Sequence, residues 1–273
     1  MAMCYRHPSR ETGVSCSSCG RPICPDCMTP TSVGMRCPEC AKQATKVMTM
    51  RNMATKPRVT FALIAINVLA YLGEEGQLTL SGTSIHGPLI EEGVLYRYGV
   101  GVEHQYWRLL SSAFLHENLL HIGFNMYLLY LLGMMLEPAL GSLKFATIYF
   151  TSLFAGSFGA LFATGAPSLG ASGAIFGLMG AAVIELRARR MSVMESGVGA
   201  LIVINLIFSF TFANISVGAH IGGLIGGALA ALAIRTADDR HRSWLGLAAC
   251  FVLSAACIAG AIAVAGSTAS GIA

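Results

Sequence analysis

Two short stretches, Gly170-Ala171-Ser172-Gly173 and Gly218-Ala219-His220-Ile221, decide how this chain is interpreted. Each opens a long apolar segment that is rich in glycine. A hydroxyl and an imidazole are the two groups that a catalyst with a nucleophile and a base requires. Polar and ionisable side chains are costly at membrane depth, so they indicate function by default. The two residues are far apart in sequence, and the hypothesis therefore requires a fold that brings them together.

The composition predicts a polytopic membrane protein with a small soluble part. Of the 273 residues, 54% are hydrophobic and 12% are charged, whereas soluble domains are about one quarter charged. The net charge of +4 is mild and does not favour a nucleic-acid partner. Residues 1–43 contain no apolar signal-peptide core, so we expect this part to stay in the cytosol.

Four parts follow one another along the chain: a Cys-rich domain at 1–43, a basic linker at 44–58, an apolar core at 59–235, and a final span with a tail at 236–273. The apolar region is long enough for seven membrane helices, several of them a little short for a bilayer. The predicted spans are 59–74, 116–137, 143–164, 171–187, 197–213, 218–235 and 244–265.

Loop charges predict the orientation of these spans. Arginines follow the fourth and sixth spans, whereas the joints at 165–170 and 213–216 carry no Lys or Arg. The positive-inside rule then places the N-terminus in the cytosol and the C-terminus outside. Ser172 and His220 both enter their spans from the outer side and lie at similar depth.

Glycine spacing predicts how the two spans meet. Small residues four positions apart let helix backbones approach closely in lipid. One such row is Ala219, Gly223 and Gly227, next to a row of Gly218, Gly222 and Gly226, and the fourth span carries Gly173 and Gly177. If these faces meet, Ser172 and His220 come within hydrogen-bonding distance. The alternative is that the glycines serve ordinary packing.

A second polar cluster, His116 to Asn125, lies at the start of the second span. His121 and Asn125 are four residues apart and share a helix face. Together with the backbone N–H of Ser172 they are suitable donors for an oxyanion; the alternative is a His/Asn pair that bonds a neighbouring helix. The only acid in spans four to six is Glu185, near the far end of its span. A Ser–His dyad is therefore predicted, not a triad.

In order and spacing, these pieces resemble rhomboid intramembrane serine proteases over about residues 57–235. The matching motifs are Trp107-Arg108, His116-x4-His121-x3-Asn125, Gly133-x3-Glu137-x3-Gly141, Gly170-x-Ser172-Gly173 and Ala219-His220-x2-Gly223-x3-Gly227. The resemblance implies an all-α core of six helices with a cavity that is open to the outer side. The span after the core resembles the "six plus one" subtype.

The resemblance also implies roles for single residues. Ser172 would be the nucleophile and His220 the general base, and the Ser172 amide, His121 and Asn125 would form the oxyanion hole. Phe176 stands where many members have a Tyr stacked on the catalytic His. Arg108 and Glu137 would be structural, and we assign His116 no chemical role.

Eight potential metal ligands occupy the N-terminal domain in four pairs, each with two residues between its members. They are Cys4, His7, Cys16, Cys19, Cys24, Cys27, Cys37 and Cys40. This pattern predicts two structural Zn²⁺ sites and resembles a B-box-type zinc finger. Either a cross-brace (the first pair with the third, the second with the fourth) or sequential pairing fits. A disulfide framework is disfavoured in the cytosol.

The predicted function is an intramembrane serine endopeptidase that cleaves transmembrane protein substrates in the bilayer near its outer face, in a bacterial plasma membrane. We predict no cofactor for catalysis. We expect the zinc domain to bind a cytosolic protein rather than nucleic acid. The first rival is a non-catalytic rhomboid-like quality-control factor, which retention of Ser172 and His220 disfavours. The second is a transporter, which would predict inverted repeats that the sequence lacks.

Overall fold

The computed structural model describes residues 2–42, 56–74, 87–163, 166–211 and 216–269. The chain divides into two compact units, 1–53 and 54–273. Most of the predicted linker and the C-terminal end of the predicted tail lie outside the described residues. The two units are considered separately below.

The first unit has very little regular structure. It contains the antiparallel pair β1 (Ala2–Met3) and β2 (Glu11–Thr12), and the hairpin β3 (Thr29–Thr31) and β4 (Gly34–Arg36). A 3-10 turn, η1 (Pro25–Cys27), and the short helix α1 (Pro38–Lys42) complete it. Its buried cluster consists of six cysteines and Ile23. A core of this size needs a further cross-link to fold, because small domains bury too little apolar surface.

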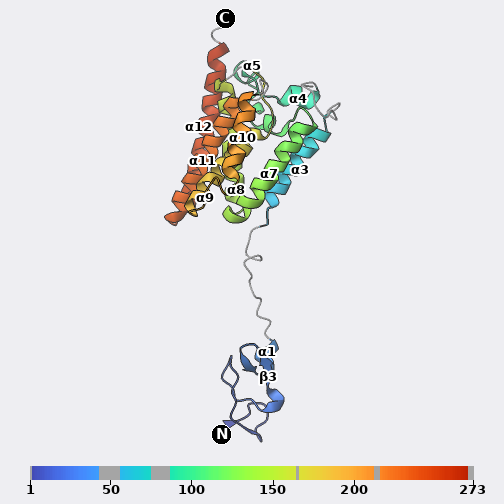
Figure 1. Ribbon diagram of the computed structural model, residues 1–273, viewed down its shortest axis with the longest axis vertical. Coiled ribbons are helices and arrows are strands. Elements are labelled where there is room, and N and C mark those ends of the chain that lie inside the picture. Colours follow the sequence, from blue (N-terminus) through green and yellow to red (C-terminus); the bar gives the residue numbers. More distant parts are fainter. Residues whose placement is uncertain (1, 43–55, 75–86, 164–165, 212–215, 270–273) are drawn as a thin grey trace. The chain divides into compact units, whose positions relative to one another are not determined.

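In its described residues, the second unit is an all-α membrane fold with seven main helices, one for each predicted span (Figure 1). They are α3 (Arg58–Leu72), α7 (Leu119–Leu140), α8 (Ser142–Ala163), α9 (Ser172–Ala188), α10 (Val198–Thr211), α11 (Val217–Asp239) and α12 (Ser243–Ala269). By length and composition, α7, α8, α11 and α12 are able to cross a membrane. Helices α3, α9 and α10 are shorter, with 15, 17 and 14 residues.

Helix α11 packs against α8, α9 and α12, and its glycines make this possible. A Cβ added at Gly223 would overlap the carbonyl oxygen of Gly173 on α9, and one added at Gly227 would overlap that of Gly177. The neighbouring row meets α8, where a Cβ at Gly218 would overlap the carbonyl of Gly159. The predicted meeting of the two glycine faces is therefore observed.

The predicted start of the second span at residue 116 is three residues too early. Helix α7 begins at Leu119 because the Asn118 side chain caps it, accepting a 2.9 Å hydrogen bond from the His121 N–H. A side-chain acceptor at this position satisfies one of the amides that a helix start leaves unpaired. His116 therefore lies before the helix, whereas His121 and Asn125 lie within it.

Glu137, near the end of α7, joins the starts of α3 and α8. Its carboxylate accepts from the Val59 N–H at 2.9 Å, from the Thr60 N–H at 2.8 Å and from the Thr60 hydroxyl at 2.6 Å. The Ser142 hydroxyl donates to it at 2.6 Å. A buried carboxylate with four donors and a place at two helix N-termini is well stabilised. These contacts agree with the structural role expected for Glu137.

Short helices occupy the segment between α3 and α7. They are α4 (Pro88–Gly93), α5 (Arg97–Gly101), α6 (Arg108–Ser111) and the 3-10 turn η2 (Ser112–Phe114). Arg108 is buried and donates from Nη1 to the carbonyl oxygens of Glu91 and Val94, both at 2.9 Å. Arg97 donates from Nε to the carbonyl of Leu161, near the end of α8, at 2.7 Å. Arg108 thus holds the parts of this segment together, and Arg97 holds the segment against α8.

Candidate active site and metal sites

Ser172 is the first residue of α9, and the turn before it sets its position. Gly170 has φ +115°, a conformation that glycine adopts readily, and its N–H donates to the Ser112 carbonyl at 2.8 Å. The chain then enters the helix at Ser172, where amides of the first turn lack intrahelical acceptors. Ser172 therefore presents a hydroxyl and a backbone donor at the same place.

His220 lies on the first turn of α11 and faces Ser172. Its Nε2 is 2.8 Å from the Ser172 Oγ, although the residues are 48 apart in sequence. The His220 side chain is buried, at 6% exposure, between α9 and α10. The close packing of Gly223 on Gly173 brings the two helix starts together and makes this distance possible.

Phe176 lies one turn after Ser172 and stacks on the imidazole of His220. Their ring centroids are 4.1 Å apart and the ring planes differ by 15°. The expected stacking is thus present without a phenol hydroxyl. The ring restricts rotation of the imidazole, so His220 is held with one edge toward Ser172.

The other edge of the imidazole meets Ser209 on α10. Ser209 Oγ lies 2.5 Å from His220 Nδ1, and the same hydroxyl is 2.7 Å from the carbonyl oxygen of Asn205. Both α10 residues are buried, whereas most of the large apolar side chains of this helix are exposed. The sequence interpretation missed both residues. The sequence does contain a signal for them, because they are a polar pair in a mostly apolar helix. Residues four apart share one helix face, so both were candidates to face the site.

The two predicted oxyanion donors lie on α7 beside the Ser172 turn. A Cβ placed on Gly170 would come within 2.7 Å of His121 Nε2, so this imidazole rests directly against the backbone before Ser172. Asn125 donates from Nδ2 to the His121 carbonyl at 2.9 Å. An amide nitrogen carries two N–H groups, so Asn125 keeps one for a further acceptor.

His116 is buried behind His121. The centroids of the two rings are 5.0 Å apart and their planes differ by 71°, an edge-on contact. Neither ring nitrogen of His116 has a hydrogen-bond partner among the described residues. The position is consistent with a packing role for His116 behind the predicted donor.

A cavity of about 660 Å³ connects these residues. It is lined by Ser172, His220, His121, Asn125 and Ser209, and by apolar side chains of α7, α9 and α10. This volume is far above the ~15 Å³ that one water needs. The cavity therefore has room for both a peptide segment and water next to the Ser172 hydroxyl.

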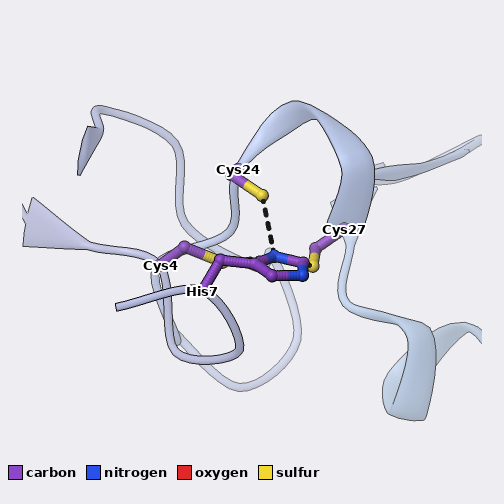
Figure 2. Close-up of side chains that lie close together, drawn as sticks. All are labelled: Cys4, His7, Cys24 and Cys27. Atoms are coloured by element: carbon purple, nitrogen blue, oxygen red, sulfur yellow. Dashed lines mark hydrogen bonds between the residues drawn. The ribbon is translucent and has the colours of Figure 1, made fainter. Parts of the chain in front are cut away.

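In the N-terminal unit, four ligand atoms from Cys4, His7, Cys24 and Cys27 converge (Figure 2). His7 Nδ1 is 3.9 Å from the Sγ of Cys4, 3.3 Å from that of Cys24 and 3.4 Å from that of Cys27. Tetrahedral zinc with Zn–S of about 2.3 Å and Zn–N of about 2.0 Å places such atoms roughly 3.6 Å apart. The donor set and spacing therefore fit one metal ion.

The second cluster joins Cys16, Cys19, Cys37 and Cys40. The Sγ atoms of Cys19 and Cys37 are 3.8 Å apart, the spacing of two thiolates on one tetrahedral ion and not of a disulfide. All nine cysteines are free. Of the two pairings that the sequence allowed, the structure has the cross-brace, and sequential pairing is excluded.

The thiol pKa values show why these clusters suit a cation. The backbone N–H of Cys37, 3.3 Å from the Cys16 Sγ, lowers the pKa of Cys16 to about 6. Hydrogen bonds with Cys37 and Cys19 raise the pKa of Cys40 to about 12. Thiolates in such close contact repel one another, and a divalent cation removes this repulsion.

The segment that holds this site is similar in sequence to known proteins. A family model described as the Rhomboid domain matches residues 103–237. Rhomboid protease GluP of Bacillus subtilis is 35% identical over 182 residues, which are 66% of this chain and 35% of that protein. Rhomboid-like protease 1 of Toxoplasma gondii is 31% identical over 174 residues, 60% of this chain and 52% of that protein.

A protein named as inactive is also similar, over a shorter stretch. Inactive RHOMBOID-like protein 8 of Arabidopsis thaliana is 38% identical over 110 residues, 40% of this chain and 31% of that protein. The chain thus spans between about a third and a half of the length of these relatives. Through the matched domain, which contains both Ser172 and His220, the chain belongs to the rhomboid family.

Proposed function

We propose that this rhomboid is an intramembrane serine endopeptidase that cleaves transmembrane protein substrates near the outer membrane face. The observation that carries the proposal is the 2.8 Å contact between Ser172 Oγ and His220 Nε2 at the wall of a large cavity. A nucleophile in hydrogen-bonding reach of a base, which is itself oriented by a third group, is the arrangement of covalent catalysis.

In the proposed reaction, Ser172 Oγ attacks the carbonyl carbon of the scissile peptide and its proton passes to His220 Nε2. The negative charge that forms on the carbonyl oxygen is bound by the Ser172 N–H, His121 and the second N–H of Asn125. The C–N bond then breaks, and His220 gives the proton to the leaving amine. A water, deprotonated by His220, hydrolyses the acyl-enzyme and restores Ser172.

The orientation proposed for the protein supports a site near the outer face. The charged end of α11 is tied to the start of α8, where Lys144 Nζ lies 2.6 Å from the Asp238 carboxylate. This end also carries Arg235 and Arg240, as expected of a cytosolic face. Ser172 and His220 begin their helices at the opposite end, which supports a site near the outer face. The orientation we propose has the N-terminus of the chain in the cytosol and its C-terminus outside.

The rival is a non-catalytic rhomboid that binds membrane proteins. The Arabidopsis relative is named as inactive. Identity to this relative and to GluP is similar, so identity does not separate the two functions. The presence of both members of the pair in hydrogen-bonding contact favours the protease.

Labelling with a fluorophosphonate tests the proposal, because the probe reacts only with an activated serine. We expect the purified wild-type protein to be labelled at Ser172, and labelling to fall at least about 100-fold in Ser172→Ala and His220→Ala, in line with the loss of a nucleophile or base. Ser267→Ala, an exposed serine on α12, is the matched control and should label normally. A folded wild-type protein that is not labelled would contradict the protease and favour the rival.

For the N-terminal unit we propose two structural Zn²⁺ ions, one in each Cys/His cluster. Four thiolate or imidazole ligands in a closed tetrahedral set are typical of structural zinc, which leaves no position open for catalysis. The unit would then be a cytosolic zinc finger that binds a protein partner. Its metal should be found in the purified protein at two zinc per chain, and a folded unit without metal would contradict this.

A further inference from the structure

Ser209 bonds to the edge of His220 that faces away from Ser172, and its hydrogen-bond partners restrict where the protons lie. The hydroxyl has a single proton, and the Asn205 carbonyl, 2.7 Å away, is only able to accept. If the Ser209 proton lies in that bond, the 2.5 Å contact with His220 requires that Nδ1 carries a proton and donates it to Ser209 Oγ.

The tautomer of His220 decides whether it is able to act as a base. A neutral imidazole carries one proton, so an Nδ1–H leaves Nε2 with a free lone pair. That lone pair accepts the hydrogen bond from Ser172 Oγ at 2.8 Å. In the other tautomer Nε2 would donate to Ser172, and the serine proton would have no acceptor on His220.

We propose that Ser209 is a positioning residue that holds His220 in the Nδ1–H tautomer and so prepares Nε2 to take the proton of Ser172. It fills the place that an acid has in a Ser–His–Asp triad, without a charge at membrane depth. Ser209 is 2% exposed, so its bond to His220 is largely shielded from bulk water. Phe176, stacked on the ring, keeps the imidazole in the plane that both bonds need.

The tautomer is measurable without turnover, by ¹⁵N NMR of histidine-labelled, full-length protein in detergent micelles. The spectrum of His220 is assigned by its loss in His220→Ala. In the wild type we expect a pyrrole-type Nδ1 and a pyridine-type Nε2. In Ser209→Ala we expect a mixture of both tautomers, because the buried Nδ1–H has lost its acceptor.

Fluorophosphonate labelling gives the kinetic effect, which rests on the proposed protease function. Loss of one hydrogen bond predicts a labelling rate lower by roughly tenfold in Ser209→Ala. Ser209→Thr keeps the hydroxyl and should restore both the tautomer and the rate. Thr211→Ala is the matched control: Thr211 makes the same bond to the carbonyl four residues earlier, 2.7 Å to Ile207, but points to the exposed side of α10.

The outcomes separate this inference from the protease proposal. A wild-type His220 protonated at Nε2 overturns the positioning role whether or not the protein labels, and so does a Ser209→Ala protein with unchanged tautomer and rate. A wild type with Nδ1–H and no labelling supports the inference and contradicts the protease. If Ser209→Ala does not fold, Ser209→Cys keeps the volume with a poor acceptor, and the mixed tautomers are expected there.

Discussion

Glu137 is a single residue on which three helix ends depend. Its carboxylate lies at 0% exposure and accepts four hydrogen bonds from Val59, Thr60 and Ser142. The amides of Val59 and Thr60 belong to the start of α3, and Ser142 belongs to the start of α8. Without this acceptor, buried donors would remain unpaired at both starts.

We therefore expect Glu137→Gln to lower the free energy of unfolding by roughly 2–4 kcal/mol, because an amide replaces a charged acceptor with one oxygen and two donors. Thermal unfolding in detergent, followed by circular dichroism, measures this. Glu103→Gln is the control: this exposed carboxylate accepts one bond from Tyr96 and its loss should shift the midpoint little. Equal stability of both variants would contradict the role of Glu137.

Residues at the site differ in how far the sequence predicted them. Ser172, His220, His121 and Asn125 were named because their motifs are local and resemble a known family. Ser209 was missed, because its role depends on how α10 is turned about its own axis, and packing decides that rotation. Apolar periodicity predicts His116 inside the helix, because it does not reveal that Asn118, two residues later, caps the helix start.

At the scale of elements, the contact of α9 with α11 sets the distance between Ser172 and His220. Spacing of small residues predicted this contact, since a row of glycines four apart has few uses other than close backbone approach. The short helices α4 to α6 were not predicted, because their sequences lack a clear period and they are held by Arg108 and Arg97 instead.

Gly223→Ala tests the contact directly. The new Cβ would overlap the carbonyl oxygen of Gly173, and backbone atoms on both sides leave it no room to move. We expect a loss of about 1–3 kcal/mol of stability and a larger fall in labelling at Ser172, because the helix starts must separate. The thermal midpoint and the labelling rate are measured together.

Gly123→Ala in α7 is the matched control for that experiment. It makes the same change within a helix, but nothing lies within 4 Å of the added Cβ. Alanine favours helix over glycine, so this variant should be neutral or slightly stabilised. If Gly223→Ala behaves like Gly123→Ala, then glycine packing does not set the Ser172–His220 distance.

At the scale of the whole molecule, the chain consists of two units with different sources of stability. Residues 54–273 bury a large apolar core between helices, whereas residues 1–53 bury mainly thiols. The first should depend on its bilayer or detergent and the second on its metal.

Removal of zinc by a chelator should therefore unfold only the N-terminal unit. Proteolysis would then cut within residues 2–42. Labelling of Ser172 should stay within about twofold of its initial rate, because among the described residues every ligand of the two clusters lies in the N-terminal unit. Mass spectrometry of the fragments and the label intensity report both. Loss of labelling on chelation, restored by added zinc, would contradict this independence.

The place of α11 between α8 and α9 has a consequence for biosynthesis. During translation the glycine faces of α8 and α9 leave the ribosome before α11, their common partner, has been made. Ser172 is then present in the membrane, while its base, His220, is still untranslated. Under the proposed mechanism the nascent chain is thus a zymogen without a propeptide, inert toward its neighbours in the translocon until its sixth core helix is inserted.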